Sequence, residues 1–106
     1  MKPIGTHNYF VYITTNKSKR VLYTGVTNDL TNRLIEHEEE SKHGKRSFAG
    51  RYRAYHLIYF EHFNYVMDAI SREKQIKGGI RKRKEALINS FNPEWRFLSE
   101  ELSDNL

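Results

Sequence analysis

Two polar side chains lie on the apolar face of a predicted helix. Leu30 and Leu34 define that face, and Arg33 and His37 share it because they follow Leu30 by three and seven positions. A guanidinium group is always charged and forks onto oxyanions, whereas an imidazole can exchange protons near neutral pH. The two residue types together suit chemistry on an anionic group.

A carboxylate lies at a similar position in a second predicted helix, residues 65–77. Glu73 falls in the middle of an apolar stripe that includes Val66, Ala69, Ile70 and Ile76. A carboxylate there is costly unless it is paired or bound to a metal. One interpretation is a structural Arg33–Glu73 ion pair with His37 hydrogen-bonded nearby. Three such residues on two sheet-facing helices favour a functional site instead, because local rules tend to break at such sites.

Two tyrosines extend the candidate site onto strands. Tyr12 and Tyr23 lie in adjacent predicted strands, and strand alternation can bring both to one face. Gly25 follows on the face of Tyr23, where the missing side chain allows a close approach to the backbone. Ordinary core packing is the alternative for both tyrosines. We expect Tyr12, Tyr23, Arg33, His37 and Glu73 to converge on one concave patch.

The elements that would position these residues follow from apolar patterning. We expect strands over 9–13, 21–26 and 55–60, helices over 30–40, 65–77 and 80–90, and a basic loop over 41–54. Thr27, Asn28, Asp29 and Asn64 are candidate helix caps, and Gly78-Gly79 should end the second helix. The order β-β-α-β-α-α indicates an α+β domain with a three-stranded antiparallel sheet flanked by helices. We expect one domain over 1–98 and a frayed acidic tail over 99–106.

The composition narrows the partners. The chain has 106 residues, a formal charge of +5 and no cysteine, which favours a polyanionic partner and excludes disulfides and thiolate metal sites. No secretory leader or membrane-spanning run is evident, so we expect a cytoplasmic protein that binds DNA and no membrane. The expected DNA contacts are Gly25, Lys42, Lys45, Arg46, Arg51, Arg53, Lys77, Arg81, Lys82, Arg83 and Lys84.

The motifs together resemble the GIY-YIG nuclease domain, and in particular its small stand-alone bacterial group. Phe10-Val11-Tyr12 corresponds to the first triplet, Tyr23-Thr24-Gly25 to the second, and Arg33 with His37 to the Arg-x-x-x-His helix that follows. The similarity continues through residues 57–61 and 69–77 and ends near residue 95. Phe10 stands where the family has glycine. Asn89 and Asn92 are both candidates for an asparagine that many members carry near their last helix.

The resemblance implies a metal-dependent DNA endonuclease of low sequence specificity, with selectivity for DNA structure as a further option, that acts in DNA repair or processing. It places a divalent cation, Mg²⁺ or else Mn²⁺, on Glu73. Arg33 would clamp the phosphate, Tyr12 or Tyr23 would orient or deprotonate water, and His37 would orient the phosphate or move a proton. The alternatives are a nucleic-acid-binding module that has lost catalysis on the same fold, and a protein-interaction domain with a structural Arg33–Glu73 pair.

Overall fold

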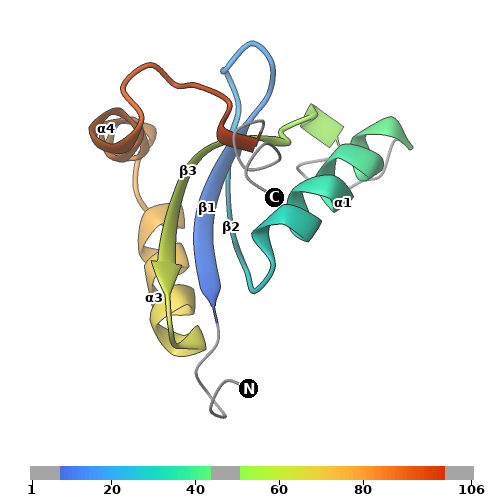
Figure 1. The fold of residues 1–106 in the computed structure, drawn as a ribbon. Coiled ribbons are helices and arrows are strands. Elements are labelled where there is room, and N and C mark those ends of the chain that lie inside the picture. Colours follow the sequence, from blue (N-terminus) through green and yellow to red (C-terminus); the bar gives the residue numbers. More distant parts are fainter. Residues whose placement is uncertain (1–7, 44–50, 100–106) are drawn as a thin grey trace.

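The computed structural model describes residues 8–43 and 51–99 and confirms the predicted α+β class. Its elements follow the expected order (Figure 1). They are β1 (Tyr9–Thr15), β2 (Leu22–Thr27), α1 (Leu30–Lys42), β3 (His56–Phe63), α3 (Val66–Lys77) and α4 (Arg81–Phe91).

The three strands form one antiparallel sheet in the order β2-β1-β3, so β1 is central and β2 is an edge strand. The register between β1 and β2 places Tyr12 opposite Gly25 and Thr14 opposite Tyr23. Residues directly opposite one another point to the same side of a sheet. Tyr12, Tyr23 and Gly25 therefore share one face, as the sequence predicted.

The helices cover the two faces of this sheet separately. Leu30 and Leu34 of α1 pack with Tyr12, whereas Ala69 and Ile76 of α3 belong to a second cluster. That second cluster also contains Val11, Ile13 and Ile88, so it lies on the opposite face of β1 from Tyr12. Figure 1 shows α1 on one side of the strands and α3 with α4 on the other.

The structure corrects several predicted boundaries. Helix α1 continues through Lys42 and residues 51 and 52 are helical, so the loop predicted over 41–54 is too long where the structure describes it. Asp29 caps α1 by accepting a hydrogen bond from the Asn32 amide. Asn64 is not the cap of α3, which begins after Tyr65 without a side-chain cap. Gly78 ends α3 as predicted. The expected acidic tail lies outside the described residues apart from Ser99.

None of the helices within residues 8–43 and 51–99 is long and apolar enough to cross a membrane.

Candidate active site

Tyr12 lies at the centre of the candidate site because Gly25 makes room for its ring. A Cβ atom placed on Gly25 would lie 2.5 Å from the Tyr12 hydroxyl oxygen and 2.6 Å from the carbon that carries it. Such a separation is far inside van der Waals contact, so only glycine fits opposite Tyr12. The side chain that closely approaches Gly25 is Tyr12, and Gly25, which was expected to contact DNA, is buried.

The Tyr12 hydroxyl meets His37 of α1. Its Oη lies 2.9 Å from His37 Nε2, and both side chains are almost completely buried. Burial is the main reason why the pKa of Tyr12 lies well above its usual value, and the nearby Tyr23 adds to the effect. Burial also lowers the pKa of His37 below 6.5, with help from the Arg33 charge. The pair is therefore a neutral phenol beside a neutral imidazole near pH 7.

Arg33 lies at the open side of this pair. Its Nη1 is 2.7 Å from Glu36 Oε2 and 3.7 Å from Glu40 Oε1, and 31% of its side chain is exposed. Burial opposes the charge of Arg33, but Glu36 and Tyr12 outweigh burial and raise its pKa. The guanidinium is therefore fixed, charged and accessible, which is what an oxyanion clamp requires.

Tyr23 completes a cluster of three rings on the α1 side of the sheet. Its ring centroid lies 6.2 Å from that of Tyr12 and 5.3 Å from that of His37. Tyr23 is partly exposed whereas Tyr12 is 1% exposed, so Tyr23 is the tyrosine nearer to solvent. Four of the five predicted residues, Tyr12, Tyr23, Arg33 and His37, thus lie together.

Glu73 lies on α3 and therefore on the other side of the sheet from α1. It sits between Ala69 and Ile76 as predicted, with 16% of its side chain exposed and its carboxylate 3.5 Å from Lys77 Nζ. The Lys77 ammonium in turn lies 6.0 Å from the centre of the Tyr23 ring. Tyr23 belongs to the edge strand β2, so a side chain from α3 can reach it past that edge. Lys77 does so, and it therefore lies between Glu73 and the ring cluster. Tyr12, Tyr23, Arg33 and His37 therefore share the α1 face, whereas Glu73 is related to them through Lys77 at the β2 edge.

The Arg33–Glu73 ion pair considered from the sequence is replaced by three ion pairs, each within a single helix. Arg33 pairs with Glu36 and Glu40 on its own helix, and Glu73 pairs with Lys77 on its own helix. Both acidic partners of Arg33 lie outside the set of site residues predicted from the sequence. Their spacing of three and seven positions from Arg33 was the available signal, because such residues share a helix face.

The donor set fits a hydrated divalent cation held by one carboxylate. Among residues 8–43 and 51–99, no group of three or more His, Asp and Glu side chains could enclose a metal ion. Mg²⁺ commonly keeps several waters and binds one or two carboxylates together with substrate phosphates. Glu73 could bind such a hydrated ion if the Lys77 ammonium moved away from its carboxylate. The described residues do not surround an ion with several protein ligands.

The two candidate asparagines have structural roles. Asn92 is buried at the end of α4, where its Nδ2 donates to the carbonyls of Ile58 and Arg96 and its Oδ1 accepts from the Arg96 amide. Asn89 accepts a hydrogen bond from Trp95 Nε1. Asn92 is tied to β3, at the opposite edge of the sheet from β2. Neither residue is brought to the ring cluster.

The predicted basic residues are divided among several elements. Lys42 lies at the end of α1 beside Glu39, and Arg51 and Arg53 are exposed near the start of β3. Lys45 and Arg46 lie outside the described residues. Arg81 is engaged structurally, because its guanidinium binds Glu85 and donates to the carbonyls of Lys19 and Arg20. The remaining basic residues of α4 are Lys82, Arg83 and Lys84.

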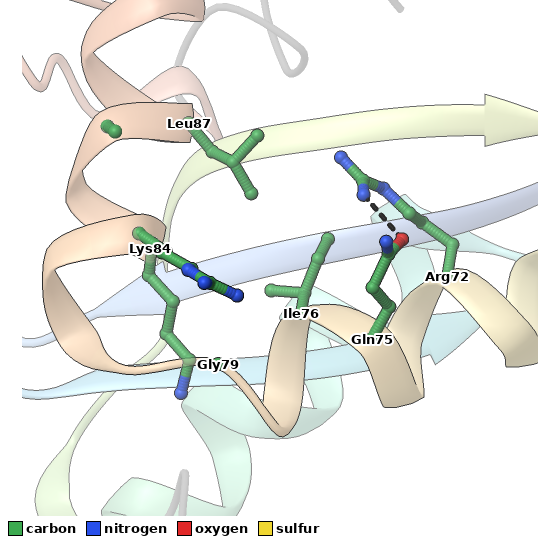
Figure 2. Close-up of a pocket in the computed structure, with 8 residues that line it drawn as sticks. Arg72, Gln75, Ile76, Gly79, Lys84 and Leu87 are labelled. Carbon is green, nitrogen blue, oxygen red and sulfur yellow. Dashed lines mark hydrogen bonds between the residues drawn. The ribbon is translucent and has the colours of Figure 1, made fainter.

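Helices α3 and α4 enclose a basic groove of about 360 Å³ (Figure 2). Ile76 and Leu87 form part of its apolar floor, and Arg72, Arg83 and Lys84 supply positive charge around it. Arg72 is held by Glu61 and Gln75. The groove lies on the α3 side of the sheet, so it is separate from the Tyr12–His37 pair.

Comparisons with known proteins give three matches. The model of the GIY-YIG catalytic domain matches residues 8–86. A UPF0213 protein of Haloquadratum walsbyi is 37% identical over 79 residues, which make up 74% of this chain and 84% of that protein. The solution NMR structure of a UPF0213 protein from Bacillus halodurans aligns with 77% of this chain and 83% of its own, at 30% identity and a TM-score of 0.47.

Proposed function

The chain belongs to the GIY-YIG catalytic domain family, and we propose that it is a metal-dependent DNA endonuclease that hydrolyses phosphodiester bonds. Members of this family are typically nucleases. The proposal rests on one observation. The Arg33 guanidinium, the Tyr23 phenol and the His37 imidazole gather around the Tyr12 side chain. Phosphodiester hydrolysis needs an activated water and fixed positive charge at the phosphate. The Arg33 guanidinium would supply the charge, and the tyrosine hydroxyls with His37 would activate the water.

Arg33 is the proposed phosphate clamp. Its guanidinium already holds the Glu36 carboxylate at 2.7 Å, in a position that phosphate oxygens could take over. An exchange of one anion for another keeps the charge of Arg33 compensated throughout. A lysine at this position would lose the planar fork that binds two oxygens at once.

Water activation is assigned to the two tyrosines acting with His37. Tyr23 is the more exposed and would contact the attacking water, while Tyr12 lies behind it against His37 Nε2. A free tyrosinate is disfavoured at Tyr12 because burial raises the pKa of its hydroxyl. Tyr12 would instead pass its own proton to the neutral imidazole as it receives one from the water side. No separate charge then accumulates on the buried phenol.

Glu73 is the proposed metal ligand. A divalent cation, Mg²⁺ or Mn²⁺, would supply Lewis-acid stabilisation of the charge on the phosphate and the leaving oxygen. Glu73 would bind it with one carboxylate at the β2 edge, and Lys77 would move to the DNA backbone.

The proposed substrate is DNA with little sequence preference, in a repair or processing role in the cytoplasm. The basic residues are spread over α1, the start of β3 and α4, which suits contacts to phosphates along a strand. Phosphate contacts position a protein on DNA without reading its sequence.

The test is nicking of supercoiled plasmid with Mg²⁺, with Mn²⁺ and with chelator, for the parent and for Glu73→Gln. The parent should nick only with metal, and Glu73→Gln should lower the rate by at least roughly a hundredfold, because the sole ligand charge is removed. Its thermal stability should change by less than about 1 kcal/mol, since the Glu73–Lys77 pair is a single ion pair near the surface.

Glu85→Gln is the matched control, because Glu85 also pairs with a basic residue four positions away. It should cut at the parent rate. Metal-independent cutting, or parental cutting by Glu73→Gln, would contradict the proposed metal ligand. A parent that retards DNA on a gel without nicking it under any metal would establish a binding module instead. The structural engagement of Asn89 and Asn92 is the observation that favours this second candidate.

A further inference from the structure

We propose that Glu40 is a positioning residue of this centre, which fixes the tautomer of His37 so that Nε2 can take the Tyr12 proton. The inference rests on the proposed nuclease function and extends it to a residue outside the set predicted from the sequence.

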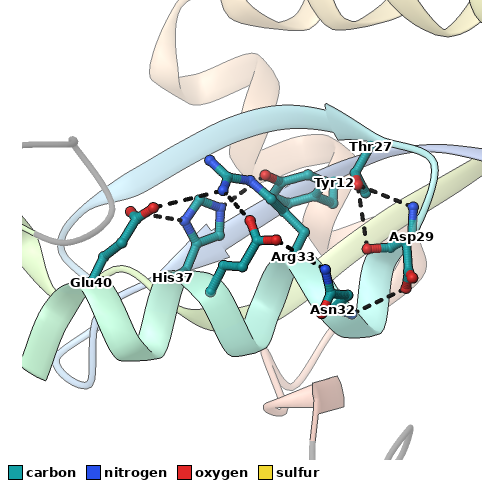
Figure 3. A network of polar contacts seen from close by, with 8 residues as sticks. Tyr12, Thr27, Asp29, Asn32, Arg33, His37 and Glu40 are labelled. Atoms are coloured by element: carbon teal, nitrogen blue, oxygen red, sulfur yellow. Dashed lines mark hydrogen bonds and ion pairs between the residues drawn. The ribbon is translucent and has the colours of Figure 1, made fainter.

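The geometry places one carboxylate between two members of the site. Glu40 Oε1 lies 3.7 Å from Arg33 Nη1, and Glu40 Oε2 lies 3.8 Å from His37 Nδ1. Figure 3 shows the carboxylate directed at both groups, with Tyr12 on the other side of the imidazole. Glu40 thus lies at the end of a line that runs from a carboxylate through an imidazole to a phenol.

The imidazole needs such a partner. His37 is completely buried, and its Nδ1 makes no hydrogen bond within the part of the chain that the structure describes. Glu40 Oε2 is slightly beyond hydrogen-bond length, so a small side-chain rotation would complete the bond. A carboxylate facing Nδ1 favours the tautomer with the proton on Nδ1, because a lone pair there would face negative charge. Nε2 is then left as an acceptor for the Tyr12 hydroxyl at 2.9 Å.

The proton transfer balances in this arrangement. As the water oxygen bonds to phosphorus, its proton passes to the tyrosine hydroxyls and the Tyr12 proton passes to His37 Nε2. The bond from phosphorus to the leaving oxygen breaks, and that oxygen takes a proton from solvent. The imidazolium returns its extra proton through the same hydroxyls to water. Glu40 stabilises the imidazolium while it exists, as the triad carboxylate does in serine hydrolases.

Other groups that face His37 set the background for this effect. Arg33 and Glu36 approach it from α1, Tyr12 from β1 and Tyr23 from β2. Burial and Arg33 lower the pKa of His37, whereas Glu40 and Glu36 raise it. Removal of the Glu40 charge should therefore lower the pKa of His37 further.

The kinetic test compares Glu40→Gln, Glu40→Asp and Glu39→Gln in plasmid nicking across pH. Glu40→Gln should lower the maximal rate by roughly tenfold to a hundredfold, which is only part of the roughly 10²–10⁴-fold that a general base contributes, because the imidazole itself remains. Its acid limb should move to lower pH, because an opposite charge that raises the pKa of His37 has been removed. Glu40→Asp should recover part of the rate. Glu39 is exposed and pairs with Lys42 and His43, so Glu39→Gln removes the same charge from the same helix without effect.

Nitrogen NMR of His37 in the intact chain supplies a readout that does not depend on cleavage. The parent should carry its proton on Nδ1, and Glu40→Gln should lose this preference and titrate at lower pH. A parent with the proton on Nε2, or a Glu40→Gln variant with unchanged tautomer and unchanged acid limb, would overturn the role of Glu40. Failure of the parent to nick DNA would instead sink the nuclease, so the two failures are distinguishable.

Discussion

The chemistry of the candidate site depends on how a buried phenol can exchange a proton. Burial raises the pKa of Tyr12, so deprotonation by itself is unfavourable near neutral pH. Contact with a neutral imidazole removes this obstacle, because the proton can move from oxygen to nitrogen in step with the reaction. The environment that makes Tyr12 a weak acid is therefore compatible with a role as a relay.

A substitution at Gly25 should disturb this relay without touching a reacting group. In Gly25→Ala the added methyl would overlap the Tyr12 hydroxyl and the carbon that bears it, so the ring must move away. Overpacking of this kind typically costs about 1–3 kcal/mol. We expect a loss of stability in this range in thermal unfolding, together with a loss of nicking, because the displaced hydroxyl no longer meets His37.

Gly78→Ala is the control that tests whether replacement of any glycine by alanine is harmful. Gly78 is exposed at the end of α3 with φ −77°, a conformation that alanine adopts readily. Its stability should change by less than about 1 kcal/mol, with nicking retained. If Gly25→Ala were as harmless as Gly78→Ala, the ring of Tyr12 would not be fixed by the glycine opposite.

At the scale of elements, α1 behaves as its sequence predicts. The apolar stripe of Leu30 and Leu34 packs on the sheet, and His37, three residues beyond Leu34, is carried into the core with it. The helical period is sufficient to predict these positions. The end of the helix was less predictable. It lies at Lys42 rather than at residue 40, because neither Ser41 nor Lys42 strongly disfavours helix.

The arrangement of α3 could not be predicted in the same way. Helical periodicity placed Glu73 toward a sheet, but it does not say which face of the sheet receives the helix. The central strand gives no help, because both faces of β1 are buried and its sequence is apolar or threonine on both sides. The sequence therefore favoured one face for all five residues, whereas α1 and α3 take opposite faces of the sheet.

The sequence also could not predict the tertiary contacts of the two candidate asparagines. Spacing could not choose between Asn89 and Asn92, because the turn that follows α4 decides what each one contacts. Asn92 satisfies the backbone of Ile58 and Arg96 there, a pattern that depends on tertiary contacts.

Helix α4 supplies a prediction about DNA affinity. Lys82, Arg83 and Lys84 follow one another, and two of them line the groove against α3. In the variant Lys82→Gln/Arg83→Gln/Lys84→Gln, DNA affinity should fall and the slope of log affinity against log salt should lose up to about three units, since each neutralised phosphate contributes about 0.9. Fluorescence anisotropy with labelled duplex DNA at several salt concentrations measures both quantities.

The control removes the same charge from the β1–β2 turn, as Lys17→Gln/Lys19→Gln/Arg20→Gln. These side chains are exposed, so the fold should be preserved. Arg81 is left unchanged in both variants because it joins α4 to the carbonyls of that turn. Equal slopes for the two variants would show that net charge alone, rather than contacts of α4, governs the affinity.

At the scale of the whole molecule, α1 covers one face of the three-stranded sheet, and α3 with α4 covers the other. The proposed site residues on the two faces are related through the β2 edge, where Lys77 approaches Tyr23. The α1 side holds the phenols, the guanidinium and the imidazole, and the α3 side holds the carboxylate. We propose that the phosphate binds at the β2 edge, between these two groups of residues, so that the proposed proton relay and Glu73 act on it from opposite faces of the sheet.

The buried imidazole should make the folding stability depend on pH. His37 titrates near 6.5 when the chain is unfolded, and burial lowers the pKa in the folded protein. The unfolded state therefore binds the proton more readily as the pH falls below about 6.5, so stability present above that pH is lost on acidification. The slope contributed by this one residue can reach about 1.4 kcal/mol per pH unit between the two pKa values.

Urea unfolding between pH 5.5 and 7.5 tests this expectation in the parent, His37→Gln and His43→Gln. Glutamine can still contact the Tyr12 hydroxyl but does not titrate, so His37→Gln should lose the slope in this window whatever its stability at pH 7.5. His43 is exposed at the end of α1, and His43→Gln should keep the parental slope. A His37→Gln variant that kept the parental slope would show that His37 is not the buried neutral base on which the relay depends.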